Sequence, residues 1–178
     1  VGRTLADELK QLQTNVPADP PDVVRETLTT ELGQPIEELF SEFDDVPLAS
    51  ASIGQVHRAR LGDGTDVVVK VRHASIESII RDDLEVLSGL ASLAEQIDEF
   101  KPYRPSATVA ELSRGLLREL DFGREERNLQ QFGELFREDD RIRIPQPFTD
   151  FCTSRILTME RLEGVKLDSE EALDGTRF

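Results

Sequence analysis

The amino-acid sequence predicts an α+β fold, in which one antiparallel sheet is fed by consecutive hairpins and packs against long helices. Three observations predict it. Apolar residues recur at helical spacing up to about residue 45 and again over 75–136. Strand-like alternation rich in β-branched residues occupies 47–72. Strand character returns over 142–160. The expected order is therefore helices, three strands, two helices and two strands.

Residues 1–45 are predicted to form a helical extension. Its first helix has one apolar face made of Leu5, Leu9, Leu12 and Val16. A second helix is expected to start near Pro21 and to end at Gly33, because proline favours the first helical position and glycine the position just after the last turn. Pro35 is expected to open a short third helix with an apolar stripe of Ile36, Leu39, Phe40 and Phe43.

Three antiparallel strands are predicted next, over residues 47–52, 55–61 and 66–72. Gly62-Asp63-Gly64 lies between the second and third and predicts a hairpin, because glycine readily adopts the positive φ of tight turns. The third strand contains a run of valines, which favours a strand with at least one buried face.

Two long helices are predicted after the strands, over residues 75–99 and 106–136. Gly123 is a weak point in the second helix, where a break or bend is expected. The segment 142–160 then returns to strand character, and within it 154–159 is predicted to be a buried strand.

Composition excludes several classes of function. The formal net charge of -15 argues against a nucleic-acid partner, because phosphate backbones need a basic surface. A single cysteine excludes an internal disulfide framework and fits a reducing, cytoplasmic compartment. The two histidines have no ligand cluster at zinc spacing, so no metal site is expected. No apolar run reaches the roughly 18 residues of a membrane span, and the first residues lack the apolar stretch of a signal peptide.

The acidity is spread along the whole chain rather than gathered in one tail. One hypothesis is adaptation to high salt, where a carboxylate-rich surface stays solvated and its self-repulsion is screened. The alternative is an ordinary acidic protein. Unfolding at low salt with rescue by molar KCl would support the first hypothesis.

Lys70 is the first candidate for chemistry. Strand periodicity places Val67, Val69 and Val71 on one face of the third strand and Val68 and Lys70 on the other. A lysine inside a valine run must find a partner or reach solvent, because an unpaired buried ammonium is costly. A lysine on an edge strand facing water is the alternative.

A loop of small residues precedes Lys70, with the sequence Ala49-Ser50-Ala51-Ser52-Ile53-Gly54. Small side chains allow backbone N–H groups to approach a phosphate closely, as glycine-rich loops do. The loop contains a single glycine and lacks the usual spacing of such loops, so an ordinary tight hairpin is the alternative.

An acidic run follows at Arg118 to Glu126. On a continuous helix Asp121 and Glu125 would share a face, and one carboxylate would meet Lys70. That pair would hold the ammonium toward the α- and β-phosphates of a nucleotide. A solvated charge run is the alternative.

The strand that ends before Gly164 suits a hinge whose backbone would hydrogen-bond an adenine edge, although by itself it is only a strand end. The order of these features is typical of a protein-kinase small lobe: a small-residue loop, then a strand lysine, a helix carboxylate and a hinge. The chain resembles the UbiB/ADCK/AarF family of atypical kinase-like proteins. Two segments carry this resemblance: the residues from Glu42 to Ala59, and Glu119-Leu120-Asp121-Phe122 followed by Glu125. The resemblance extends from about Leu5 to Leu167.

The resemblance implies a nucleotide site for ATP or ADP with Mg²⁺, in which an alanine-rich loop replaces the glycine-rich loop. Lys70 matches the phosphate-binding lysine and Glu125 its partner. Glu119 and Asp121 match an E-x-D motif that contacts a family-specific K-x-G-Q helix. The positions expected to line the nucleotide site are Ala49, Ser50, Ala51, Ser52, Ile53, Gly54, Val56, Val68, Lys70, Glu125, Met159, Glu160 and Leu162.

The resemblance also implies what to expect outside this stretch. No K-x-G-Q occurs, and no catalytic-loop aspartate or metal-binding D-F-G aspartate follows the hinge. We therefore expect an N-terminal half of a longer protein: a helical extension (1–45), a small lobe (46–162), and a hinge with the truncated start of a large lobe (163–178). No catalytic residue and no magnesium ligand is expected within it.

The resemblance implies that the parent is a kinase-like ATPase supporting ubiquinone or other isoprenoid-lipid metabolism, peripheral to the inner face of a membrane. The chain alone is expected to bind nucleotide weakly, not to turn it over, and to self-associate through the surface that a large lobe would cover. Two alternative hypotheses remain. One is a non-catalytic pseudokinase scaffold that senses nucleotide and binds partners through its helices, and the other is a helical interaction domain that never binds nucleotide.

Overall fold

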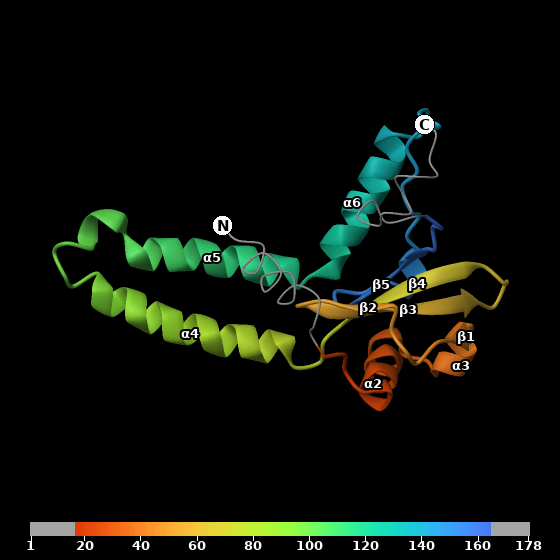
Figure 1. Ribbon diagram of the computed structural model, residues 1–178, viewed down its shortest axis with the longest axis horizontal. Helices are drawn as coiled ribbons and strands as arrows, with labels where there is room; N and C mark the ends of the chain where they lie inside the picture. Colours follow the sequence, from red (N-terminus) through yellow and green to blue (C-terminus); the bar gives the residue numbers. More distant parts are fainter. Residues whose placement is uncertain (1–16, 165–178) are drawn as a thin grey trace, which may run out of the picture.

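An antiparallel sheet of five strands is the centre of the computed structural model, which describes residues 17–164 (Figure 1). The helix expected over Leu5 to Val16 lies outside the described residues. The sheet order is β1-β3-β4-β5, with β2 beside β3. The strands are β1 (Phe40–Phe43), β2 (Ala49–Ser50), β3 (Gly54–Leu61), β4 (Asp66–Arg72) and β5 (Ile156–Glu160). This arrangement confirms the α+β prediction.

The β3–β4 hairpin has the turn that the sequence predicts. Gly64 adopts φ 88°, a conformation that residues with a side chain rarely take. The Asp63 carboxylate accepts a hydrogen bond of 2.9 Å from the Thr65 N–H and so stabilises the turn. The register from Gly54↔Arg72 to Arg60↔Asp66 is continuous, so the two strands match the predicted ranges closely.

The N-terminal helices agree with prediction at α2 (Pro21–Leu32) and depart from it afterwards. Gly33 ends α2 at φ 73° and donates to the Thr29 carbonyl at 2.9 Å. The third helix, α3 (Ile36–Leu39), is a single turn. The expected continuation through Phe40 and Phe43 is wrong, because those residues form strand β1.

The reason for β1 is tertiary. Phe40 pairs with Leu61 on β3 and is only 3% exposed. Its ring contacts those of Phe43 and Phe151, with centroids 5.9 and 5.7 Å away. Burial of aromatic residues against the sheet outweighs the weak helical preference of so short a segment. The sheet therefore begins at Phe40, and the first expected strand, 47–52, contracts to the two residues of β2.

Between β4 and β5 the α-helices are three rather than two. They are α4 (Ile76–Ala94), α5 (Pro105–Glu119) and α6 (Phe122–Leu135). The first expected helix ends at Ala94 rather than near 99. The break expected at Gly123 falls instead at Leu120 and Asp121, because groups at this junction have tertiary partners: Phe122 N–H donates to the Ser154 carbonyl at 3.0 Å.

The two faces of the sheet are covered differently. Helices α2 and α3 lie against one face, and α6 against the other (Figure 1). The first face holds the packed core, whose buried residues are Val24, Leu28, Ile36, Leu39, Phe40, Ala59, Leu61, Val67, Val69, Val71 and Ile156. Helices α4 and α5 form a hairpin that projects away from the sheet (Figure 1). Among the helices of residues 17–164, none is long and apolar enough to cross a membrane.

Candidate functional site

Lys70 lies in the interior of the sheet, on β4 between β3 and β5. Its Nζ donates to the Glu125 carboxylate on α6 at 2.6 Å, and the two side chains are 21% and 42% exposed. The edge-strand alternative is therefore wrong, and the predicted lysine–carboxylate pair is present. Its role in nucleotide binding stays a prediction.

Phe122 is a further member of this site that the sequence analysis did not single out. The ring is 1% exposed, and Lys70 Nζ lies 4.5 Å from its centroid, a distance that favours attraction between the ammonium and the π face. Ring and carboxylate thus hold the ammonium from two sides. The available signal was position: Phe122 precedes Glu125 by about one helical turn.

Asp121 and Glu125 do not lie within one continuous helix, contrary to expectation, because α5 ends at Glu119 and α6 begins at Phe122. Asp121 is the N-cap of α6, and its Oδ1 accepts from the Gly123 N–H at 3.0 Å. Asp121-Phe122-Gly123 spells D-F-G, but capping and burial account for its aspartate and phenylalanine, so the string is no metal-binding motif here. Across residues 17–164 there is no cluster of three or more side chains suited to a metal ion.

Glu119 and Asp121 line a small hollow together with Glu125, beside the α5–α6 junction. The hollow also includes Arg118 and Arg124, so its charge is mixed. The structure thus brings the E-x-D residues next to the Lys70 partner. Their contact with a K-x-G-Q helix stays a prediction.

The small-residue loop turns tightly between β2 and β3. Ala51 N–H donates to the Gly54 carbonyl at 2.9 Å, whereas the N–H groups of Ser52 and Ile53 donate to none of the described residues. Those two amides are the donors that a phosphate would need. Gly54 has a different reason for being glycine: a Cβ there would lie 2.6 Å from the Val71 carbonyl oxygen, so β4 already fills that space.

His73 and Asp19 hold this loop in place, and neither was expected in the site. His73 Nε2 lies 3.0 Å from the Ala51 carbonyl, and the His73 N–H donates to the Ile53 carbonyl at 3.1 Å. Asp19 accepts from the Ala74 N–H at 2.9 Å, and its other oxygen is 3.3 Å from His73 Nδ1, near but out of line for a hydrogen bond. No local sequence pattern predicts this contact, because Asp19 is far away along the chain.

An open groove of about 880 Å³ runs between the loop, the sheet and the hinge. Three of the expected residues meet there: Ala49 from β2, Val68 from β4 and Leu162 after β5. Arg58 and Arg161 add positive charge to its wall. No described residue accepts a hydrogen bond from the Leu162 N–H, which is thus available as a hinge donor.

The other expected hinge residues are placed less favourably. Met159 pairs with Val68 on the neighbouring strand, beside the groove. The Glu160 N–H donates to the Gln146 carbonyl at 2.8 Å, and its carboxylate pairs with Arg143. Glu160 lines a separate hollow near the end of α6. Its N–H is therefore already used within the fold.

Comparison with known proteins gives three results. The ABC1 atypical kinase-like domain matches residues 11–178. The chain is 38% identical over 174 residues to the probable protein kinase UbiB of Pseudomonas paraeruginosa, covering 97% of this chain and 33% of that protein. It is 34% identical over 176 residues to the protein ACTIVITY OF BC1 COMPLEX KINASE 7, chloroplastic, of Arabidopsis thaliana, covering 99% and 25%.

The solved complex of Rv3197 with erythromycin from Mycobacterium tuberculosis superposes with a TM-score of 0.70 at 27% identity, covering 93% of this chain and 41% of that one. The likeness supports the kinase-like small-lobe fold. The chain spans about a third of the length of the bacterial relatives it matches. On the match over residues 11–178 and these likenesses, the chain belongs to the ABC1 family of atypical kinase-like proteins.

Proposed function

We propose that this chain is the nucleotide-binding half of an atypical kinase-like ATPase and that ATP or ADP binds in the groove between the small-residue loop and the hinge. The observation that carries the proposal is the Lys70–Glu125 ion pair, formed between an interior strand and a helix that are 55 residues apart in sequence. An ammonium fixed in this way presents a positive charge next to Val68, which lines the groove from the same face of β4.

The parts of a nucleotide would meet different groups of the chain. The apolar wall at Val68 suits an adenine ring, and the Leu162 N–H suits an adenine ring nitrogen. The amides of Ser52 and Ile53, together with Lys70, suit the phosphates. These residues fit the phosphate groups better than they fit a metal, since residues 17–164 contain no cluster of three or more side chains suited to Mg²⁺.

Binding without turnover is the expected behaviour of the chain alone. Phosphoryl transfer needs a base or water-positioning group and carboxylate or amide ligands for magnesium near the γ-phosphate. The residues around Lys70 supply phosphate-binding groups and one carboxylate, which the ammonium already occupies. We propose that the parent protein supplies the remaining groups and that its activity supports isoprenoid-quinone metabolism.

Calorimetric titration with Mg·ADP and Mg·ATP tests the site. We expect Lys70→Met to weaken binding about tenfold or more, because a charge-assisted contact to a phosphate is lost. The change should alter the free energy of unfolding by less than about 1 kcal/mol, since Glu125 is exposed enough to be solvated by water.

Lys101→Met is the matched control. It removes the same charge from an exposed lysine beyond α4, whose ion-pair partner among the described residues is Asp98. We expect this variant to bind nucleotide like the unmodified chain. Equal loss in both variants, or unchanged binding by Lys70→Met, would refute the phosphate site.

One observation favours the alternative hypothesis, that of a scaffold that binds partners through its helices. Large apolar side chains on α4 are exposed in a row, with Val86 64%, Leu90 58% and Leu93 62% exposed. Such a row is typical of a surface that binds protein. Sedimentation of Leu90→Ser tests whether it also drives the expected self-association: a fall in the association constant relative to the unmodified chain would place the contact on α4 rather than near the hinge.

A further inference from the structure

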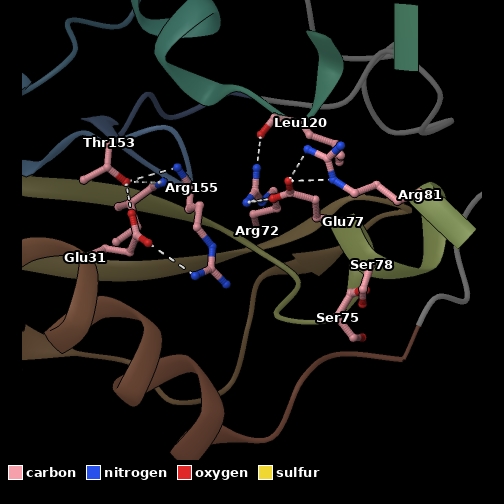
Figure 2. Close-up of polar contacts among 10 residues, drawn as sticks. Glu31, Arg72, Ser75, Glu77, Ser78, Arg81, Leu120, Thr153 and Arg155 are labelled. Atoms are coloured by element: carbon pink, nitrogen blue, oxygen red, sulfur yellow. Dashed lines mark hydrogen bonds and ion pairs between the residues drawn. The ribbon is translucent and has the colours of Figure 1, made fainter. Parts of the chain in front are cut away.

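A second basic pocket lies at the end of the sheet that is far from the hinge. Strand β4 ends there at Arg72, β5 begins just after Arg155, and α4 begins its first turn (Figure 2). The pocket has a volume of about 400 Å³. Three guanidinium groups and one carboxylate are among its lining residues, which are Arg72, Ala74, Glu77, Ser78, Arg81 and Arg155. It is a concentration of positive charge on a chain of net charge -15.

Arg72 is buried in this pocket, with 7% of the residue exposed. Its Nη1 donates to the Leu120 carbonyl at 2.7 Å and its Nη2 to Glu77 at 2.8 Å (Figure 2). The third donor, Nε, is buried and has no partner among residues 17–164. A buried N–H group without an acceptor is unfavourable, because the hydrogen bond that it loses to water is not replaced.

One edge of the Arg155 guanidinium group has no hydrogen-bond acceptor among the described residues. Its Nη1 donates to Glu31 at 3.2 Å (Figure 2). Its Nε is buried without a partner in the described chain, and its Nη2 donates to none of the described residues. Nε and Nη2 form the edge with which arginine binds carboxylates and phosphates through two parallel hydrogen bonds.

The first turn of α4 adds two backbone donors. Ser75 is the N-cap, but its side chain makes no capping hydrogen bond, and none of the described residues accepts from the N–H of Glu77 or Ser78. Glu77 and Ser78 both line the pocket. The N-terminus of this 19-residue helix favours an anion through its free N–H groups and its dipole.

The electrostatics of the pocket also favour an added anion. Burial lowers the pKa of Arg72 and the nearby positive charge of Arg155 lowers it further, while the carboxylates of Glu77 and Glu31 partly offset these effects. The two guanidinium groups therefore repel each other. A negative charge between them would relieve both effects.

We propose that this pocket binds a small tetrahedral oxyanion, either inorganic phosphate or the phosphate group of a monoester, at the Nε–Nη2 edge of Arg155. The Nε of Arg72 and the amides of Glu77 and Ser78 complete the site. This site is separate from the nucleotide groove, because the two share no lining residue. It does not depend on the function proposed above.

Bound phosphate would add a contact between α4 and the strands β4 and β5, which already pair with each other through their backbones. It would join the first turn of α4 to the end of β4 and the start of β5. Arg72 also holds the Leu120 carbonyl, which directly precedes α6 and its Glu125. The anion would therefore stiffen the junction that positions the partner of Lys70.

The test is titration of the ¹⁵N-labelled 178-residue chain with inorganic phosphate at constant ionic strength, with chloride as the balancing anion. It is run in the Lys70→Met background, in which binding at the nucleotide site is weakened, so that failure of either proposal is seen separately. We expect saturable shifts of the Arg155 Nε–H resonance and of the Glu77 and Ser78 amides. Glycerol 3-phosphate is titrated in parallel, and tighter binding of it than of phosphate would identify a monoester as the ligand.

Arg155→Gln should weaken phosphate binding about tenfold or more, because two charge-assisted hydrogen bonds are lost. Arg155→Lys keeps the charge but not the two-donor edge, so its phosphate affinity should lie between those of the unmodified chain and Arg155→Gln. Arg137→Gln, which removes one exposed guanidinium group after α6, should bind phosphate normally. The proposal is overturned if the unmodified Arg155 resonance does not move at saturating phosphate, or if folded Arg155→Gln binds as tightly as the control.

Discussion

The two faces of the sheet differ in what they bury, although the same strands build both. On β4, Val67 and Val69 are fully buried against α2, whereas Val68 and Lys70 between and beside them face α6 and the groove. One face is closed and apolar, and the other is half open and charged. Because side chains alternate along a strand, a single heptapeptide contributes to the core and to the candidate site at once.

The difference separates the energetics of the two faces. Stability on the closed face comes from removing apolar area from water and from dense packing with α2 and α3. On the open face the interactions are ion pairs and hydrogen bonds that water and salt weaken. We therefore expect substitutions on the closed face to change stability and those on the open face to change binding.

The pair Val69→Ala and Val68→Ala tests this separation most strongly. Val69→Ala removes two fully buried methyl groups and should cost about 2–3 kcal/mol of unfolding free energy, because it leaves a cavity beneath the sheet. Val68→Ala should cost less than about 1 kcal/mol, because the Val68 side chain lines an open groove. Urea denaturation of both variants measures the difference.

Nucleotide affinity gives the complementary measurement. Val68→Ala should weaken Mg·ADP binding, because it removes part of the apolar wall, whereas folded Val69→Ala should bind as the unmodified chain does. Equal destabilisation by the two substitutions would contradict the view that the faces have separate roles.

His57 brings a titratable group into the closed face. It is fully buried, its Nδ1 donates to the Asp44 carbonyl at 2.8 Å, and its Nε2 accepts from Gln55 at 2.8 Å. The bond from Gln55 requires the neutral ring, because Nε2 can accept a hydrogen bond only when it carries no proton. Burial lowers the pKa of His57, while the Asp44 carbonyl bond and the charges of Asp44 and Asp45 act in the opposite direction.

The sign of the pH effect follows from this shift. Below the unfolded pKa of about 6.5 the unfolded chain binds a proton at this position and the folded chain does not. Stability is therefore complete above that pH and decreases as pH falls, by at most about 1.4 kcal/mol per pH unit for one proton. Urea midpoints between pH 7.5 and 5.5 should fall less steeply in His57→Gln than in the unmodified chain, and parallel slopes would exclude the effect.

The same contrast explains what the sequence could predict. The alternation of the valines placed Val67 and Val69 on one face of β4 and Lys70 on the other, and the resemblance to the kinase-like family singled out Glu125 as its partner. Period-two burial is a local property, so local patterns are sufficient to find it. The hairpin glycine at 64 is a local property for the same reason.

The features that were missed depend on contacts between distant segments. Phe40 belongs to a strand only because β3 offers it an edge, and Asp121 caps α6 only because the helix breaks there. The contact of Asp19 with the segment that follows β4 joins residues 55 positions apart. Periodicity within a window of residues contains no information on such pairings. The residues that position the site could therefore not be predicted from the sequence, although its charged pair could.

The smallest expected effect is at Arg60, near the hairpin end of the open face. Arg60 lies between Glu42 and Asp66 and donates to each carboxylate at 2.9 Å, with 41% of its side chain exposed. Arg60→Gln leaves the two carboxylates without an intervening cation, so its urea midpoint should be slightly lower at low salt. In 1 M KCl, where the Debye length is about 3 Å, the difference should disappear.

Arg60→Lys is the control, because it retains the positive charge and should match the unmodified chain at both salt concentrations. If Arg60→Gln stays destabilised to the same extent in 1 M KCl, packing of the arginine stem rather than its charge is responsible. The open face would then contribute to the stability of the fold as the closed face does, and the contrast between the two faces would be one of degree.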